Sequence, residues 1–234
     1  MQIMLPGLGK QLEFFLKNYN AVPKKILVIG SASEYIAKSI AEQFNCRVDL
    51  IVEDYESLLN SKLLIGNNSD INIKLMEYDI TDFQDSEFDL VYAQASISLT
   101  KRNKIIKELK RITKAGSYFC MGEIVNLTQP VPRFIKDIYD STDLLPLHVE
   151  SIEQYYSERG FSILASSDFS KSLRDYYRNT LNMLKNSKQH LTDSEKSYYK
   201  KLLNKISHES NAYLKLGGDK YTGFKVLLLQ KGQN

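Results

Sequence analysis

The chain has 234 residues, a length that one hydrophobic core can serve without splitting into several domains. Apolar residues make up 43% of it and charged residues 25%, which excludes an intrinsically disordered protein. Its 31 basic and 28 acidic residues leave a formal net charge of +3, so a nucleic-acid partner is not expected.

The positions of the cysteines and the hydropathy of the chain bear on metal binding, disulfides and membrane insertion. Cys46 and Cys120 lie outside any Cys-x-x-Cys or His-rich cluster, so neither a disulfide framework nor a metal site is expected. Residues 1–10 lack the pattern of a secretory signal, and no run approaches the ~20 apolar residues of a membrane span. We therefore expect a soluble, cytoplasmic protein with no membrane partner. The residues carry no signal of an oligomeric state.

The first quarter of the chain has the pattern of a helix followed by a strand, a second helix and a second strand. Residues 8–19 place apolar side chains at three- and four-residue steps, which predicts an amphipathic helix. The apolar run 26–29 ends in Gly30 and predicts a strand that is buried on both faces, as in a parallel sheet. Ser33 is a candidate N-cap for the next helix, and residues 47–52 predict a second strand. This order implies a right-handed crossover.

The alternation of strands and helices continues to about residue 125. The expected elements are a helix at 55–64, strands at 71–77 and 88–92, a helix at 101–112 and a strand at 117–125. Parallel pairing of these strands is the simplest arrangement. Gly116 is expected to end the helix at 101–112. The Lys and Arg side chains of that helix are expected on a solvated face.

The last third of the chain departs from the alternation. Ser151-x-x-Gln154 has the pattern of a capping box for a helix, and a strand is expected at 161–165. Residues 169–220 are polar, rich in tyrosine and helix-like, with a second capping-box pattern at Thr192-x-x-Glu195. We expect them to form a helical cap, after which the chain returns to the sheet in a strand at 224–229.

Several segments together resemble one known family, the class I, Rossmann-like S-adenosylmethionine-dependent methyltransferases. In chain order they are Lys25–Gly30, Val52–Leu59, Asp79–Phe83, Phe88–Ala95, Glu108–Gly116, Glu153–Asp168 and Gly223–Lys231. The resemblance implies a mostly parallel seven-stranded sheet with an antiparallel last strand beside the fifth, and helices on both faces. It divides the chain into an N-terminal helix (1–23), a methyltransferase domain (24–168 with 221–234) and a cap insertion (169–220).

The resemblance also implies S-adenosylmethionine as cofactor. Its expected binding residues all follow the carboxyl ends of strands: Gly30, Ser31, Ala32, Glu53, Asp54, Asp79, Ile80, Gln94 and Ala95. Gly30 permits close approach of the backbone to the ligand, and the helix that follows the loop begins with free amides that can bind it. Glu53, or Asp54 if the register slips by one, would bind the ribose hydroxyls. Asp79 and Ile80 would flank the adenine.

The cofactor loop departs from the family pattern at three positions. Val28 stands where the family has an acid, Ala32 where it has its second glycine and Glu34 where it has its third. A β-carbon at Ala32 restricts positive φ. The Glu34 carboxylate is expected either to repel the carboxylate of the cofactor or to turn away and complement the helix dipole.

Methyl transfer from a sulfonium proceeds mainly by desolvation and in-line positioning, so the lack of a catalytic triad is no objection. Gln94 and Ala95 would line the site near the methyl donor, and the catalytic residue is left unassigned. His148 is a candidate by location for a base or an acceptor contact, with a purely structural histidine as the alternative.

The acceptor is expected to be a small molecule bound under the cap. Arg174, one helical turn from Arg178, is a candidate for an acceptor carboxylate or phosphate, with surface solvation as the alternative. Tyr177 could contribute to an aromatic wall, and core packing is the competing interpretation. The other tyrosines of that wall would be Tyr176, Tyr198, Tyr199 and Tyr213.

Three other functions compete with a small-molecule methyltransferase. The first is a non-catalytic or repurposed relative that kept the fold and lost cofactor binding. The second is a nicotinamide-dependent reductase, whose Tyr-x-x-x-Lys pair would lie on a helix. The only such spacing, Tyr221 to Lys225, falls on a predicted strand. The third is a methyltransferase with a macromolecular acceptor.

Overall fold

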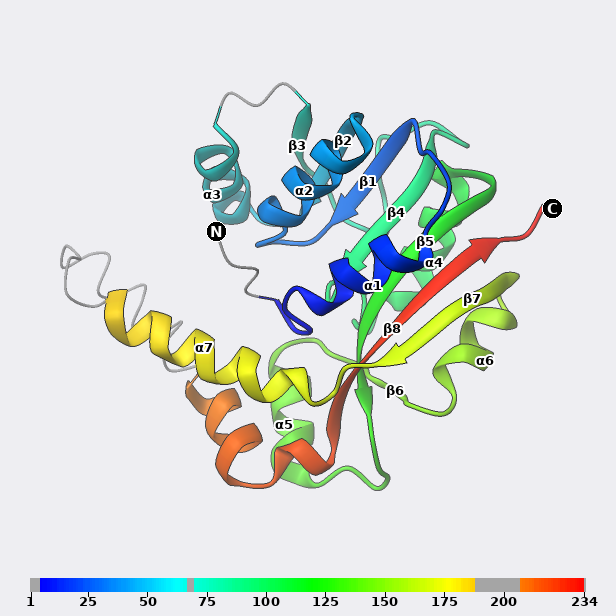
Figure 1. Ribbon diagram of the computed structural model, residues 1–234. Coiled ribbons are helices and arrows are strands. Elements are labelled where there is room, and N and C mark those ends of the chain that lie inside the picture. The colour runs from blue at the N-terminus through cyan, green and yellow to red at the C-terminus, as the bar shows by residue number, and fades with distance from the viewer. Residues whose placement is uncertain (1–4, 67–69, 188–206, 234) are drawn as a thin grey trace.

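The computed structural model describes residues 5–66, 70–187 and 207–233, and a mixed sheet of eight strands runs through its centre (Figure 1). The strands are β1 (Lys25–Ile29), β2 (Arg47–Val52), β3 (Ile71–Leu75), β4 (Phe88–Gln94), β5 (Thr113–Asn126), β6 (Leu147–His148), β7 (Phe161–Asp168) and β8 (Thr222–Lys231). Seven follow the order β3-β2-β1-β4-β5-β8-β7, and β6 pairs with β5. All pairs are parallel except those of β8, which is antiparallel to both β5 and β7. The predicted Rossmann-like class is therefore confirmed.

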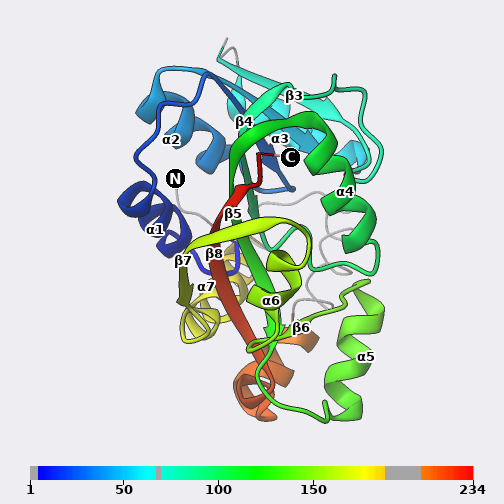
Figure 2. The same cartoon turned by 90° about the vertical axis from the view of Figure 1, so that its right-hand side faces the viewer.

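Helices cover both faces of the sheet (Figure 2). They are α1 (Lys10–Asn18), α2 (Glu34–Phe44), α3 (Tyr55–Ile65), α4 (Arg102–Ile112), α5 (Arg133–Ser141), α6 (Ile152–Ser157) and α7 (Ser172–Ser187). A short 3₁₀ turn, η2, spans Gly218–Lys220, and residues 207–215 are also helical. Buried side chains of α1 and α2 belong to the core on one face, and those of α4 and α6 to the core on the other.

β1 shows why a continuous apolar run is needed at the centre of the sheet. Ile26 and Val28 point into one core and Leu27 and Ile29 into the other, and all four are fully buried. Alternate side chains of a strand lie on opposite faces, so a strand with helices on both sides favours apolar residues at every position. The prediction of a central parallel strand is confirmed.

Two of the predicted helix caps are wrong. Ser33 and Ser151 precede α2 and α6, but neither side chain makes a capping hydrogen bond. Their ψ angles, 11° and −13°, lie far from the extended conformation that aims an N-cap side chain at the helix amides. Asp54 has this conformation, with φ −126° and ψ 151°, and its carboxylate accepts from Ser57 N and caps α3.

Gly116 lies inside a strand rather than at a helix end. α4 ends at Ile112 and β5 begins at Thr113, so the expected start of this strand at Ser117 was four residues late. Between Thr113 and Tyr118 the register of β5 against β4 shifts, and Gly116 has φ +71° there. The glycine supplies the positive φ of a bulge. A helix terminus requires the same conformation, which is why the sequence alone did not separate the two.

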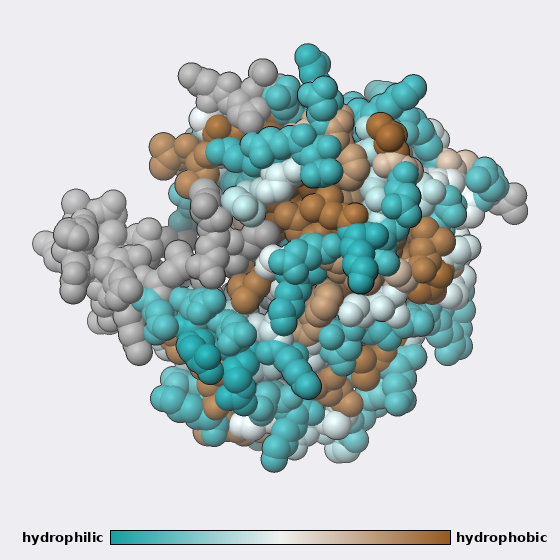
Figure 3. Space-filling view, viewed as in Figure 1, coloured by the Kyte–Doolittle hydropathy of each residue, from teal (hydrophilic) through white to brown (hydrophobic). Residues whose placement is uncertain are grey.

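The part of the chain after β5 contains elements that periodicity did not predict. α5 and β6 lie between β5 and α6, and β7 extends to Asp168 instead of ending at 165. The predicted cap contains α7 and the helix at 207–215, and its visible face is mainly hydrophilic (Figure 3). The capping box at Thr192-x-x-Glu195 lies outside the described residues. In the described part of the chain, no helix combines the length and apolarity of a membrane span.

Candidate functional site

The ends of β1, β2 and β4 and the loops that follow them meet at one edge of the sheet. Gly30 N donates to Ile51 O at 3.1 Å, which holds the loop after β1 against β2. On the other side, Ser96 Oγ donates to Ile29 O at 2.8 Å. Because all three strands are parallel, their carboxyl ends lie at the same edge, where ligands bind in doubly wound sheets.

The loop after β1 has the backbone conformation of a glycine-rich turn despite its missing glycines. Gly30 has φ +126°, and a Cβ at this position would lie 2.9 Å from Ser96 Cβ, so only glycine fits. Ala32 has φ +62°, the left-handed region, at a cost of about 1–2 kcal/mol for a residue with a β-carbon. The restriction expected at Ala32 therefore does not prevent the turn.

The two residues that follow Ala32 differ in whether their polar groups have partners. Glu34 is buried and its carboxylate accepts from Ser61 Oγ of α3. It thus turns away from the loop, which removes the repulsion considered for a cofactor carboxylate. Ser33 Oγ is buried and has no hydrogen-bond partner among the described residues. An unpaired buried hydroxyl beside a glycine turn fits a polar ligand group at this position.

Two of the predicted acids meet on one lysine. Lys101 Nζ lies 2.6 Å from Glu53 Oε1 and 3.0 Å from Asp79 Oδ1. Glu53 Oε1 also accepts from Tyr78 N at 2.8 Å. Partial burial alone would raise the pKa of Asp79, but the neighbouring Lys101 ammonium outweighs it and lowers that pKa. Asp79 is therefore held as a carboxylate, the form that accepts hydrogen bonds from hydroxyl and amino groups.

Asp54 and Ile80 flank the two paired acids in the sequence. The carboxylate of Asp54 is engaged in capping α3 through Ser57, so Glu53 rather than Asp54 shares the lysine with Asp79. The side chain of Ile80 is 72% exposed directly after Asp79. An exposed apolar side chain beside a carboxylate is suited to a flat ligand with an amino group at its edge.

Gln94 has a role that the sequence did not indicate. It is buried, and its Nε2 donates to Pro6 O at 2.7 Å and to Leu8 O at 2.9 Å. We call residues 5–9 the N-terminal segment. Gln11 adds a hydrogen bond from its Nε2 to Ala93 O at 2.9 Å. Two buried glutamines thus fasten the N-terminal segment and the start of α1 to the end of β4, next to Ala95.

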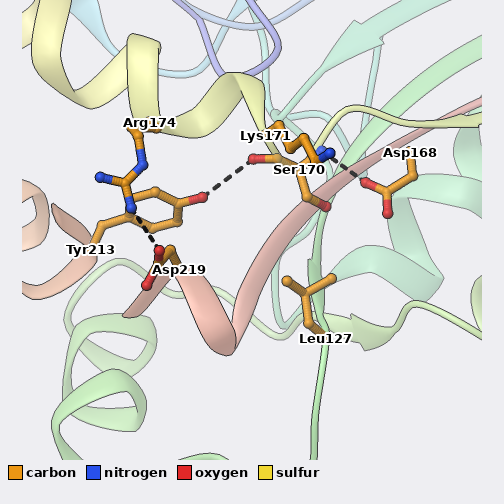
Figure 4. Close-up of a pocket in the computed structure, with 7 residues that line it drawn as sticks. All are labelled: Leu127, Asp168, Ser170, Lys171, Arg174, Tyr213 and Asp219. Carbon is orange, nitrogen blue, oxygen red and sulfur yellow. Dashed lines mark hydrogen bonds and ion pairs between the residues drawn. The ribbon is translucent and has the colours of Figure 1, made fainter. Parts of the chain in front are cut away.

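The three candidates for acceptor binding are not brought together. Arg174 pairs with Asp219 at 2.7 Å and lines a cavity of about 660 Å³ (Figure 4). The cavity is lined by Leu127, Asp168, Ser170, Lys171, Arg174, Tyr213 and Asp219. Tyr177 packs on Tyr213 with ring centroids 4.8 Å apart, and lines a separate cavity of about 30 Å³. His148 lies in β6 and lines neither cavity.

The tyrosines of the cap pack against the core. Tyr213 is buried, Tyr176 and Tyr177 pack beside it, and burial raises the pKa of each of the three. Tyr198 and Tyr199 lie outside the described residues. The packing interpretation holds for the described tyrosines, although Tyr177 and Tyr213 also line cavities.

A buried ion pair at the start of α4 was not predicted from the sequence. Arg102 Nε donates to Glu123 Oε2 at 2.8 Å, and both side chains are almost fully buried. Ser98 Oγ donates to the same oxygen at 3.2 Å, and Tyr156 donates to Oε1. Arg102 was expected on a solvated face with the other basic residues of this helix, and that expectation is wrong. Lys101 was also expected on the solvated face, but it is half-buried and paired with Glu53 and Asp79.

Comparisons with known proteins give one match to a family model and several to solved structures. Residues 27–121, from β1 into β5, match the family model described as "Methyltransferase domain". No curated protein sequence matches the chain significantly. S-adenosylmethionine is the cofactor of such domains, so the predicted cofactor is confirmed at the level of the family.

Solved structures share the fold over nearly the whole chain. A phosphoethanolamine N-methyltransferase 2 of Haemonchus contortus, in complex with phosphomonomethylethanolamine and S-adenosylhomocysteine, has a TM-score of 0.77 at 13% identity over 96% of this chain and 53% of its own. The [4+2]-cyclase SpnF has 0.75 at 16% identity over 96% and 80%. Geranyl diphosphate C-methyltransferase from Streptomyces coelicolor A3(2) has 0.70 at 9% identity over 95% and 77%. At these identities the likeness shows the fold alone.

Proposed function

Because the chain carries a methyltransferase domain of class I fold, we propose that it is an S-adenosylmethionine-dependent methyltransferase that binds its cofactor at the carboxyl edge of β1, β2 and β4. One observation carries the proposal: a glycine turn at Gly30 lies at the same edge as the carboxylates of Glu53 and Asp79. A close backbone approach and acids on the neighbouring strands are the features that an adenosyl group needs.

Each part of this edge has a role in holding the cofactor. The turn from Gly30 to Ser33, with the first amides of α2 behind it, would bind the carboxylate of the methionyl group. Glu53 would accept from the ribose hydroxyls, Asp79 from the adenine amino group, and Ile80 would cover one face of the adenine. Gln94 would act indirectly, by fastening the N-terminal segment beside the methyl donor.

The bound cofactor supplies an electrophilic methyl group, and the chain would contribute orientation and exclusion of water. We assign a small-molecule acceptor to the space under the cap. The cavity beside Arg174 and Tyr213 supports this assignment, because its volume of about 660 Å³ lies within the range of about 300–1,000 Å³ typical of small-molecule sites. Lys171 and Asp168 give it charges of both signs.

The proposal is tested by calorimetric titration of the full chain with S-adenosylmethionine, S-adenosylhomocysteine and NADH. We expect saturable binding of the first two and none of NADH. Glu53→Gln should weaken binding at least tenfold, because an amide is a poorer acceptor for the ribose hydroxyls. Asp54→Asn is the matched control: it removes a neighbouring charge but keeps a good N-cap, and should leave the affinity unchanged.

Transfer to an acceptor needs a second assay. With S-adenosylmethionine labelled in its methyl group, we expect label to enter a low-molecular-mass extract in the presence of the chain. The Glu53→Gln protein at the same cofactor concentration should transfer much less. Label that enters only the macromolecular fraction would replace the small-molecule acceptor by a protein or nucleic acid.

One alternative is favoured by a specific observation. The predicted cofactor acids are already paired with Lys101, and Tyr78 hydrogen bonds to Ser31 across the loop. A repurposed protein of this fold would use such contacts to fill the site, and SpnF, named as a [4+2]-cyclase, shows that the fold is not confined to proteins named as methyltransferases. Failure of both adenosyl ligands to bind in the titration would support this alternative.

A further inference from the structure

Lys101 joins the two acids of the proposed nucleoside site. Its ammonium lies 2.6 Å from Glu53 Oε1 and 3.0 Å from Asp79 Oδ1. The three residues come from separate segments: the end of β2, the loop after β3, and the turn before α4. Their side chains are only 26%, 27% and 9% exposed for Lys101, Glu53 and Asp79, so the contact is partly shielded from water.

An adenosyl ligand would need the same carboxylate oxygens. The ribose hydroxyls and the adenine amino group are donors, and they would compete with the lysine ammonium for the acceptor oxygens of Glu53 and Asp79. Glu53 Oε1 also accepts from Tyr78 N, a main-chain contact that does not move with the lysine. The ammonium is therefore the partner that a ligand could displace.

We propose that Lys101 is a resident cation that competes with the adenosyl ligand for Glu53 and Asp79, and so sets the affinity of the site. This inference rests on the proposed function. Lys101 is a determinant of affinity in this view, and it takes no part in methyl transfer. It holds the two carboxylates near each other when they would otherwise repel, and it withdraws as the donors of the ligand replace it.

The position of Lys101 makes withdrawal feasible. It is the residue before α4, where the positive end of the helix dipole disfavours a cation, so the ammonium is held there by the two acids against the field of the helix. Its neighbour Arg102 is buried and fixed to Glu123, which anchors the start of the helix independently. A lysine side chain has a flexible four-carbon stem, so its ammonium can swing into water while the backbone stays in place.

The test measures the affinity of S-adenosylhomocysteine by calorimetry for the full chain and for Lys101→Met, Lys101→Arg and Lys107→Met. Loss of the competing cation should tighten binding about fivefold in Lys101→Met, the size expected for part-exposed ion pairs. Lys101→Arg keeps the charge and should bind like the unmodified chain. Lys107 is exposed on the same helix, so Lys107→Met controls for the change in net charge.

Salt gives an independent readout. Ion pairs between part-exposed groups weaken as ionic strength rises. The affinity of the unmodified chain for S-adenosylhomocysteine should therefore increase between low and high salt, whereas that of Lys101→Met should not. Should the Met protein fail to unfold cooperatively on heating, Lys101→Gln serves as the second neutral variant.

The outcomes separate the inference from the proposed function. Equal or weaker binding by Lys101→Met, while the unmodified chain binds, would overturn the competition and leave the cofactor site standing. Binding by the Met protein alone would establish the competition in its strongest form. Absence of binding in all the proteins would overturn the proposed function and this inference with it.

Discussion

Removing the carboxylate of Glu123 should destabilise the fold more than the loss of any surface ion pair. Glu123 is fully buried on β5, and it accepts from Arg102 Nε at 2.8 Å, Ser98 Oγ at 3.2 Å and the hydroxyl of Tyr156. Arg102 is 3% exposed, and its guanidinium also donates to Leu145 O at 2.7 Å. In Glu123→Ala the guanidinium would stay buried without a counter-charge.

The loss in stability depends on how deeply each charge is buried. Breaking a buried ion pair by removing one partner costs about 3–5 kcal/mol, because the other charge remains desolvated. The pair of Arg174 and Asp219 is a matched contrast, since its side chains are 47% and 34% exposed. Asp219→Ala should cost less than about 1 kcal/mol. Small domains are stable by about 5–15 kcal/mol, so the first loss is a large fraction of the total.

Urea unfolding followed by circular dichroism gives the free energies of unfolding. We expect a drop of about 3–5 kcal/mol for Glu123→Ala and under about 1 kcal/mol for Asp219→Ala. The double variant Arg102→Met with Glu123→Leu should recover part of the loss, because neither charge is then left buried alone. Equal losses for the two single variants would refute the argument from burial.

Single contacts of Gly30, Glu108 and Gln94 should each affect stability or access to a protease. Gly30→Ala should destabilise the chain by about 1–3 kcal/mol in urea unfolding, because the new Cβ would lie 2.9 Å from Ser96 Cβ at a residue whose φ is +126°. An unchanged unfolding midpoint would contradict the close approach of the two residues. Burial alone would raise the pKa of Glu108, but the Arg111 guanidinium and other donors lower it to about 2. The stability that the ionised carboxylate provides is therefore present above its unfolded pKa of about 4.3 and is lost as pH falls toward 2. In calorimetry the melting temperature of Glu108→Gln should therefore fall less steeply below pH 4.3 than that of the unmodified chain, and parallel curves would contradict this cause. Gln94→Leu should free the N-terminal segment and speed its cleavage by trypsin at Lys10, and an unchanged rate would show that Gln94 is not its anchor.

The central strands could be predicted because burial on both faces leaves a clear signal. An unbroken apolar run such as 26–29, bounded by a lysine pair and a glycine, is typical of a strand in the interior of a soluble chain. Helix ends were predicted less well, because a serine before a helix caps it only if its backbone is extended. Ser33 and Ser151 are not in that conformation, whereas Asp54 is. Backbone angles of a single residue depend on tertiary contacts that a local pattern does not contain.

The location of the candidate site could be predicted, but its internal contacts could not. Parallel strands share a carboxyl edge, so residues after β1, β2 and β4 had to meet. The partner of Glu53 is 48 positions away in the sequence and that of Glu123 is 21 positions away. Both partners, Lys101 and Arg102, belong to a basic amphipathic segment, and such a segment has the pattern of a solvated face.

The same limit applies to the acceptor candidates. Arg174 and Tyr177 share α7 but line different cavities. Arg174 pairs with Asp219, and Tyr177 packs on Tyr213. His148 was a candidate only through its place between two elements. It lies in a two-residue strand paired with the end of β5, and that strand has no periodicity to reveal it.

Hydrogen exchange of the full chain, with and without saturating S-adenosylhomocysteine, tests the central claim most directly. Binding at the carboxyl edge predicts slower exchange at the segments that would surround the ligand: 30–37, 53–58, 78–81 and 94–97. The helices at 172–187 and 207–215 should change less. Protection confined to those cap helices, or no protection anywhere at saturation, would contradict an adenosyl site at the end of β1, β2 and β4.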